Sequence, residues 1–117
     1  MKGHHSSEKQ ACIDACLDCH RVCEEMAFDH CLRMGGRHVE REHYMLMLNC
    51  ADICRTSAHF LMADSKLHED VCRVCADVCE ACAESCARLE GMERCVEACG
   101  ACEQQCRQMA GAMVGAR

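Results

Sequence analysis

The sequence predicts an all-α fold, an antiparallel up-down-up-down four-helix bundle with a cysteine-lined core. The 117-residue chain contains no proline, which favours long, uninterrupted helices. Its 16 cysteines recur mostly in steps of three and four, the spacing of one face of an α-helix. Short breaks divide the chain into four stretches, as expected of helices joined by short loops.

The first helix is expected over residues 8–33. Ser7 and Gln10 fit a Ser-x-x-Gln capping box at its start, and the pair Gly35-Gly36 is expected to end it. Its core-facing stripe falls within an arc of roughly 60°. This stripe consists of Cys12, Cys16, Cys19 and Cys23.

The second helix is expected over residues 37–62 and is the poorest in sulfur. Ser57 and Leu61 occupy positions on its predicted core face that could have held cysteine. The core is therefore expected to contain less sulfur near that end. The complete predicted face is Val39, His43, Leu46, Cys50, Cys54, Ser57 and Leu61.

Two further helices are expected over residues 66–89 and 92–109. Asp64-Ser65 offers an N-cap for the third helix, and Gly91 marks the turn into the fourth. The stripe of the third spans roughly 80° and that of the fourth roughly 60°. These stripes are Cys72, Cys75, Cys79, Cys82 and Cys86, followed by Cys95, Cys99, Cys102 and Cys106.

Composition limits the domain organisation and the partners. We expect a single domain over residues 8–110, flanked by a flexible N-terminus at 1–7 and a flexible tail at 111–117. The net charge of −6, the low aromatic content and the scattered Lys and Arg residues argue against nucleic acid as a partner. No apolar run approaches the length of a membrane span, and residues 1–10 lack the apolar region of an export signal. A cytoplasmic protein is expected.

A core of sulfur needs a chemical reason. Cysteine can act as a small hydrophobic residue, but Ala, Val and Leu pack as well without the risk of oxidation. Disulfides are an alternative, although cysteines on one helix face would close only very small loops, which contribute little stability. Metal binding is the favoured interpretation.

The choice of metal follows from charge and geometry. Sixteen thiolates could hold at most about four tetrahedral Zn²⁺ ions, leaving about eight uncompensated negative charges in the core. Such a buried charge is strongly unfavourable, and no Lys or Arg lies in the stripes. Cu(I) is monovalent, is selected by thiolate and tolerates few ligands, so one Cu(I) per thiolate gives a neutral core. A zinc-binding thiolate buffer remains the alternative.

Seven Cys-x3-Cys motifs carry a resemblance that extends over residues 7–109. They begin at Cys12, Cys19, Cys50, Cys75, Cys82, Cys95 and Cys102. In these motifs the chain resembles the cysteine-rich four-helix-bundle copper storage proteins of bacteria. The resemblance implies a non-enzymatic protein that stores multiple Cu(I) ions in its core and associates as a homotetramer, with a copper chaperone as a possible partner. An exported branch carries a twin-arginine signal that this sequence lacks, so the cytosolic branch is implied.

A copper entrance is expected at one end of the bundle. Extending the first stripe past Cys23 gives Met26 and His30, and extending the second stripe backwards gives Leu46 and His43. Met92 belongs to the same end. Thioether and imidazole side chains there could pass a soft ion inward; alternatively, they are polar end residues that face solvent.

The expected metal ligands therefore comprise every cysteine together with three side chains of the entrance. Cys31 lies about 100° from the first stripe, so it is either a flanking ligand or a thiol packed against a neighbouring helix. At the opposite end, His68 lies at the centre of the third stripe, and the apolar residues nearby, Leu61, Met109 and Met113, suggest a plug. The predicted ligands are Cys12, Cys16, Cys19, Cys23, Cys31, Cys50, Cys54, Cys72, Cys75, Cys79, Cys82, Cys86, Cys95, Cys99, Cys102, Cys106, Met26, His30 and His43.

Two other expectations concern activity and assembly. A thiol redox protein is the alternative from another functional class, and it would need one cysteine with a depressed pKa. No Ser/His/Asp constellation or phosphate-binding loop is visible, so an enzyme is not expected. Apolar residues outside the stripes predict self-association. They are Ile13, Leu17, Tyr44, Met45, Leu48 and Met62.

Overall fold

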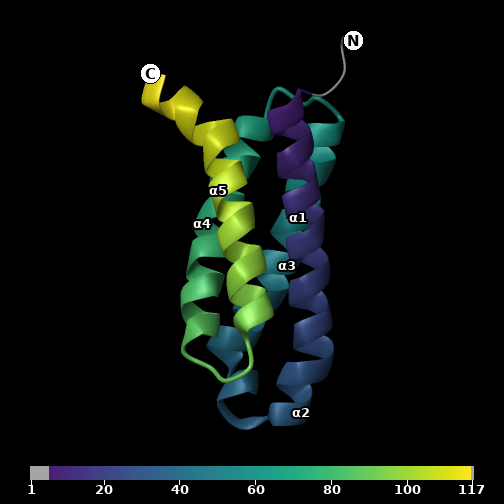
Figure 1. Ribbon diagram of the computed structural model, residues 1–117, viewed down its shortest axis with the longest axis vertical. Coiled ribbons are helices and arrows are strands. Elements are labelled where there is room, and N and C mark those ends of the chain that lie inside the picture. The colour runs from purple at the N-terminus through teal and green to yellow at the C-terminus, as the bar shows by residue number, and fades with distance from the viewer. Residues whose placement is uncertain (1–5, 117) are drawn as a thin grey trace.

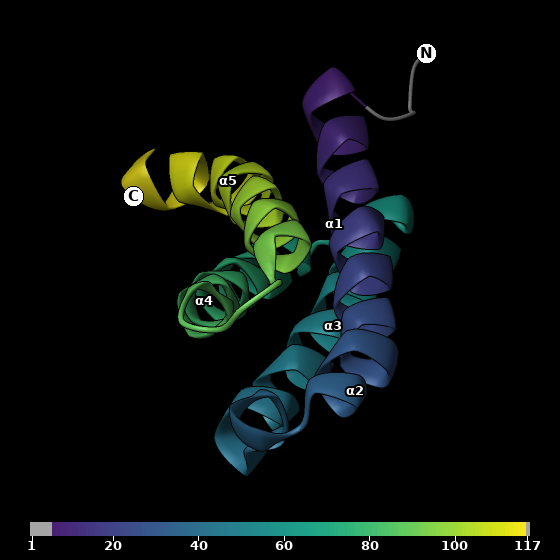
Figure 2. The same ribbon diagram turned by 60° about the horizontal axis from the view of Figure 1, so that its bottom comes forward.

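A computed structural model of the chain describes residues 6–116, and the side chains of residues 6–110. Four long helices lie antiparallel and form one bundle (Figure 1), which confirms the predicted all-α architecture. Each long helix packs against two others, so that α1, α3, α4 and α5 form a closed ring around the core. Figure 2 shows the pairs α1/α3 and α4/α5 side by side. The helices are α1 (Ser7–Met26), α3 (Arg41–Met62), α4 (His68–Ala87) and α5 (Glu93–Ala116).

The start of α1 differs from the prediction by one residue. Ser6, not Ser7, is the N-cap: its backbone is extended, and its side chain accepts a hydrogen bond of 3.1 Å from the backbone N–H of Lys9. The side chain of Gln10 donates to Asp14 on the next turn, so the predicted capping box is wrong. Residues 1–5 of the predicted flexible N-terminus lie outside the described residues.

The chain leaves α1 through a π-helical turn, Ala27–Cys31, and then forms the short helix α2 (Leu32–Met34). A π turn holds one residue more than an α-helical turn, so every later side chain is rotated relative to the preceding helix. Gly35 and Gly36 end the segment as predicted, both with positive φ, of 66° and 54°.

Helix α3 begins later than predicted, at Arg41 instead of residue 37. A 3₁₀ turn, Gly36–Val39, follows the glycine pair, and Glu40 has an extended backbone that separates the turn from the helix. The connection after the glycines is therefore longer than predicted and includes residues 37–40, which were expected to be helical.

The other two connections are tight turns at opposite ends of the bundle. Between α3 and α4, the Ser65 hydroxyl accepts from the backbone N–H of Leu67 at 3.0 Å, so Ser65 stabilises the turn and is not an N-cap. Helix α4 consequently begins at His68, not at residue 66. Between α4 and α5, Gly91 has a φ of 75°, as expected for the predicted turn.

Helix α5 continues to Ala116, past its predicted end near Met109. It therefore includes residues 111–116 of the tail that was predicted to be flexible, 111–117. Within the described part of the chain, no helix is both long and apolar enough to cross a membrane.

The core consists largely of sulfur. Every cysteine side chain is 0% exposed. On α3, Met47 takes the core position that was predicted for Leu46, which is only half-buried. Ile13, predicted on the outer surface, is buried within the bundle, whereas Leu17, Met45 and Met62 are exposed as predicted.

Candidate metal centre

The four cysteine stripes converge on the bundle axis and place thiols of different helices in contact. The sulfur of Cys54 lies 3.5 Å from that of Cys79, which links α3 to α4. The sulfur of Cys102 lies 3.6 Å from that of Cys16, which links α5 to α1. A soft ion between such sulfurs would be held by several helices at once.

Five groups of thiols have sulfur atoms that all lie within 4.8 Å of one another. Adjacent groups share members: Cys54, for example, belongs to two of them, and Cys19 to two. The groups therefore form a continuous array along the core and not a set of isolated sites. They are Cys12/Cys72/Cys106, Cys16/Cys75/Cys102/Cys106, Cys54/Cys75/Cys79/Cys102, Cys19/Cys50/Cys54/Cys79 and Cys19/Cys23/Cys50/Cys99.

The thiols form a hydrogen-bonded network that shares protons. The interaction between Cys102 and Cys106 raises the pKa of Cys102 and lowers the pKa of Cys106, because one thiol donates to the other as it ionises. No hydrogen bond to another thiol contributes to the pKa of Cys31, and burial raises this pKa to about 11. Metal binding to this core must therefore displace protons.

The cysteines are free thiols in the structure. A disulfide requires sulfur atoms about 2.05 Å apart, whereas Cys54 and Cys79 are 3.5 Å apart and the other contacts are longer, up to 3.9 Å between Cys19 and Cys50. The geometry therefore differs from that of a disulfide core.

The π-helical turn decides the position of Cys31. In a regular α-helix this residue would point away from the stripe, but the extra residue of the turn rotates it back toward the core. Its sulfur lies 3.9 Å from the Met92 Sδ atom and 4.0 Å from the His43 Nε2 atom. We call Cys31, His43 and Met92 the mouth cluster.

The same rotation moves His30 out of the predicted stripe. Its Nε2 atom lies 3.1 Å from the carbonyl oxygen of Glu90, which His38 also contacts at 2.9 Å. The two imidazole rings meet edge to face with centroids 5.3 Å apart. The structure therefore places His30 against the α4–α5 turn and not beside the core thiols.

The two other predicted entrance residues also differ in their surroundings. Met26 is buried, but its sulfur accepts from the Arg94 guanidinium at 3.8 Å, at the edge of the core. His43 does reach the core, and its Nδ1 atom lies 2.8 Å from the Ser85 hydroxyl. Burial lowers the pKa of His43, which favours the neutral imidazole that can bind a metal through Nε2.

Two methionines, Met47 and Met92, place sulfur atoms near the mouth cluster, and the sequence predicted only Met92 at the entrance. Met47, which was not predicted, places its Sδ atom 3.3 Å from the sulfur of Cys86 and 3.8 Å from that of Cys82. A sequence signal existed, because residues 43, 47 and 50 continue the four-three spacing of the α3 stripe. Met92 was expected at the entrance without being assigned as a ligand, and it is almost fully buried.

The opposite end of the core is closed by side chains that are poor ligands for a soft ion. The Ser57 hydroxyl lies 3.4 Å from the sulfur of Cys72, and Leu61 is completely buried beside this layer of α3. The His68 Nδ1 atom contacts the Ser65 carbonyl oxygen at 2.7 Å, so His68 belongs to the turn. The side chain of Met113, predicted for the plug, lies outside the described residues.

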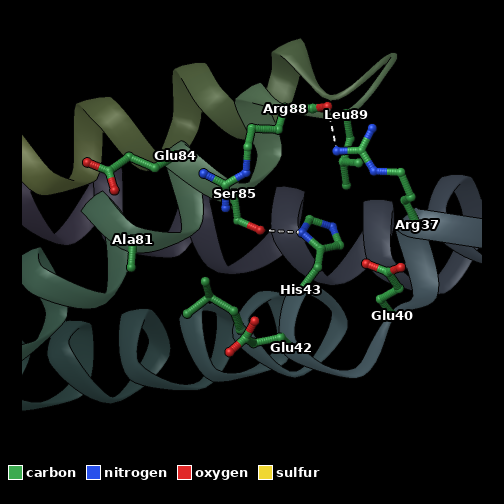
Figure 3. A pocket seen from close by; sticks show the side chains of 10 residues that line it. Arg37, Glu40, Glu42, His43, Ala81, Glu84, Ser85, Arg88 and Leu89 are labelled. Carbon is green, nitrogen blue, oxygen red and sulfur yellow. Dashed lines mark hydrogen bonds between the residues drawn. The ribbon is translucent and has the colours of Figure 1, made fainter.

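Cavities open on two sides of the mouth cluster. One, of about 360 Å³, lies between α3 and α4 and reaches His43 and Ser85 (Figure 3). Another, of about 530 Å³, lies between α4 and α5 and reaches Cys86 and Met92. Small solutes can thus approach the cysteine array at this end.

Residues 5–111 match the family described as copper storage protein. The chain belongs to the copper storage protein family. Its continuous array of thiols is the feature that this function requires, and the family consists of proteins that store copper, not enzymes.

Solved relatives have the same fold. A crystal structure of a protein from Nitrosospira multiformis superposes with a TM-score of 0.88 at 52% identity, covering 90% of this copper storage protein and 96% of that chain. The Cu(I)-bound copper storage protein BsCsp3 superposes with a TM-score of 0.81 at 35% identity, covering 89% and 99%. A cysteine-rich protein of Bacillus subtilis, YhjQ, is 37% identical over 79 residues, 68% of this chain and 72% of the relative.

Proposed function

We propose that this copper storage protein holds its Cu(I) ions as one continuous thiolate array along the bundle axis. The observation that carries the proposal is the set of five overlapping thiol groups, all inside one closed core. A sulfur that belongs to two groups, such as that of Cys19 or Cys54, can bridge neighbouring ions. A relative of the same family with the same fold is known in a Cu(I)-bound form.

Charge supports many monovalent ions over a few divalent ones. Lys9 is the one lysine or arginine that is buried among the described side chains. It pairs with Asp64 at the closed end and does not face the thiols. Thiolates filled with Cu(I) are neutral as a set, whereas zinc at four thiolates per ion would leave buried negative charge. Zinc buffering is therefore the weaker function for this core.

We propose as ligands the 16 cysteines together with His43, and add Met47 and Met92 at the mouth. Met26 and His30 stay predictions of the sequence. Met26 contacts Arg94, and His30 contacts the Glu90 carbonyl, so neither contact is to a thiol of the array.

The mouth cluster receives an ion and passes it inward by ligand exchange. His43 and Met92 supply neutral donors beside Cys31, and Met47 contacts Cys86 and Cys82 one layer deeper. At each exchange a new copper–sulfur bond replaces an old one, and the thiol that binds loses its proton. The neutral donors hold the ion only weakly, which favours its movement toward the thiolates.

An anaerobic titration tests the proposed storage. The protein is titrated with Cu(I) against a chromophoric chelator of known affinity, and we expect saturation at roughly one ion per cysteine. Saturation at one or two ions would contradict a continuous array. Competitive loading with zinc decides between the two metals: Cu(I) is expected to displace Zn²⁺ completely.

Compartment and assembly belong to the same proposal. Free thiols in this number are typical of a reducing compartment, which supports the cytosol. The exposed side chains Leu17, Met45 and Met62 support association of copies, and the family resemblance suggests a tetramer. Delivery by a copper chaperone is compatible with the exposed cavities at the mouth, and light scattering of the apo protein tests the assembly.

A further inference from the structure

The pocket between α3 and α4 has features that storage alone does not require. Its volume of about 360 Å³ lies within the range of small-molecule sites. Its inner wall contains a buried polar pair, His43 and Ser85, which are joined by the 2.8 Å hydrogen bond drawn in Figure 3. A buried polar pair at the base of an open pocket is suited to receiving a polar ligand.

Charges of both signs surround this pocket. Arg37 and Arg88 lie on one side, and Figure 3 shows three glutamates around the rest of the opening. Arg37 is oriented by its 3.4 Å hydrogen bond to the Arg88 carbonyl oxygen. Among the described residues, neither the Arg88 guanidinium nor any of these glutamates takes part in an ion pair within 4.0 Å. The glutamates are Glu40, Glu42 and Glu84.

This arrangement complements a small zwitterion. A carboxylate can form charge-assisted hydrogen bonds with the arginines, while an ammonium group faces the glutamates. A ligand carrying only one sign of charge would meet like charges on the other side of the pocket. The pocket therefore selects for an amino-acid-like molecule.

His43 connects this pocket with the copper array. Its ring lines the pocket, and its Nε2 atom lies 4.0 Å from the sulfur of Cys31. All the cysteines are completely buried, so an external donor must transfer its ion through a side chain that it can reach. A donor of Cu(I) must itself offer a soft ligand, and a thiolate is the sulfur ligand that binds Cu(I) in the core as well.

We propose that this pocket docks a small zwitterionic thiol that carries Cu(I), and that the ion passes by way of His43 to Cys31. The proposal rests on the function proposed above and adds the class of the copper donor. The carrier's S–Cu bond breaks as a Cu–N bond to His43 forms, and this Cu–N bond breaks in turn as an S–Cu bond to Cys31 forms. The Cys31 thiol proton moves to the leaving thiolate, and copper stays in the +1 state, so no oxidant or reductant is needed. Release of copper is the reverse exchange.

The neighbouring cavity between α4 and α5 is less suited to this role. It reaches Cys86 and Met92, but its one arginine, Arg94, already contacts Glu25 at 3.5 Å and the Met26 sulfur. It also lacks an imidazole at its base. Of these two cavities, the pocket at His43 is therefore the one that combines two arginines and three glutamates with an imidazole at its base.

Transfer kinetics test the proposal. The apo protein is mixed anaerobically with the Cu(I)–glutathione complex, and loading is followed in a stopped-flow spectrometer. We expect a rate that saturates with donor concentration. Arg88→Gln should lower the second-order rate constant about tenfold, the effect of losing one charge-assisted hydrogen bond.

Matched controls separate docking from general effects. Arg55→Gln removes an exposed arginine of α3 outside the pocket and should leave the rate unchanged. Transfer from the Cu(I)–cysteamine complex, which lacks a carboxylate, should be equally fast with Arg88→Gln and the unaltered protein. Glu84→Gln should slow transfer from glutathione but not from N-acetylcysteine, which lacks the ammonium group.

Equal rates for Arg88→Gln and the unaltered protein with glutathione would overturn the proposal. Equal slowing of both donors by Arg88→Gln would also overturn it, because the carboxylate would then play no part. The final copper content of each sample is measured separately. A low content in the unaltered protein would contradict storage itself, whereas full content with unchanged rates contradicts the docking site alone.

Discussion

At the scale of single residues, the mouth depends on a histidine whose orientation is fixed by a hydrogen bond to its second ring nitrogen. Ser85 contacts the Nδ1 atom of His43, so that the Nε2 atom faces Cys31. Orientation of a ligating imidazole through its second nitrogen fixes its tautomer and raises its value as a ligand. At the closed end, the Ser57 hydroxyl takes the place of a thiol and ends the array.

Replacing this hydroxyl by a thiol should extend the array. Ser57→Cys places a soft donor beside Cys72 and Cys106, and we expect the Cu(I) capacity to rise by about one ion. Native mass spectrometry of the loaded protein measures the change. Ser57→Ala is the control and should keep the original capacity; an unchanged capacity in Ser57→Cys would show that the array does not reach this layer.

Gly91 is required by both its backbone and its neighbour. Its φ is 75°, and a Cβ atom there would lie 2.7 Å from Cε1 of His30. Gly91→Ala should therefore lower the free energy of unfolding of the apo protein by about 1 kcal/mol or more. Urea denaturation measures the loss.

Gly100→Ala is the matched control for that substitution. Gly100 lies within α5, and a Cβ atom there meets nothing within 4 Å. The control should stabilise the protein by about 0.5–1 kcal/mol, because alanine favours helix. Equal effects of the two substitutions would contradict the role assigned to the α4–α5 turn.

At the scale of elements, the π-helical turn is the part of the fold that assembles the entrance. It rotates Cys31 into the mouth cluster and His30 toward the α4–α5 turn. The extra residue rotates only the side chains that follow the turn, so the cysteines before it stay on the core face of α1. A single irregular turn thus changes which of two adjacent residues faces copper.

Removing one residue from this turn tests whether the turn sets which side chains face the core. Deletion of Phe28, which is 57% exposed, should convert the π turn into a regular α-helical turn. Because the deletion also brings Cys31 one residue closer to Cys23, Cys31 would take the position of residue 30 in a regular helix, which lies on the core face. The Cu(I) capacity should therefore not change. A capacity lower by one ion, or a Cys31 thiol that becomes reactive to alkylation in the apo protein, would contradict this account.

The parts of the site that follow helical period could be predicted from the sequence. The stripes of α1, α4 and α5 repeat in steps of three and four, and a regular helix maps such steps onto one face. The exchange of His30 for Cys31 could not be predicted, because a π turn changes the phase without a clear sequence signal. Met47 could have been found, since it continues the spacing of His43 and Cys50.

At the scale of the whole molecule, the bundle uses its core as the storage site. Ordinary bundles are stabilised by apolar side chains that fill the seam, whereas here thiols fill it. Metal binding and folding are consequently coupled, because an ion that bridges helices binds only the folded chain. Loading with Cu(I) should raise the melting temperature, and a strong chelator should reverse the rise.

Proton release links loading to pH. Burial raises the pKa of Cys31 to about 11, so this thiol is protonated at neutral pH and must lose its proton when copper binds. The affinity of this site for Cu(I) should therefore rise with pH up to that value and fall as the pH is lowered. Titration of the unaltered protein and of Cys31→Ser in weak buffer measures the protons released, and the variant should release about one fewer.

The most direct measurement is diffraction from copper-loaded crystals at the copper absorption edge. The account predicts a row of anomalous peaks along the bundle axis, each within bonding distance of cysteine sulfurs from the overlapping groups. Peaks confined to the surface or to the mouth cluster, with the inner thiols unbound, would contradict the claim that the whole core stores copper.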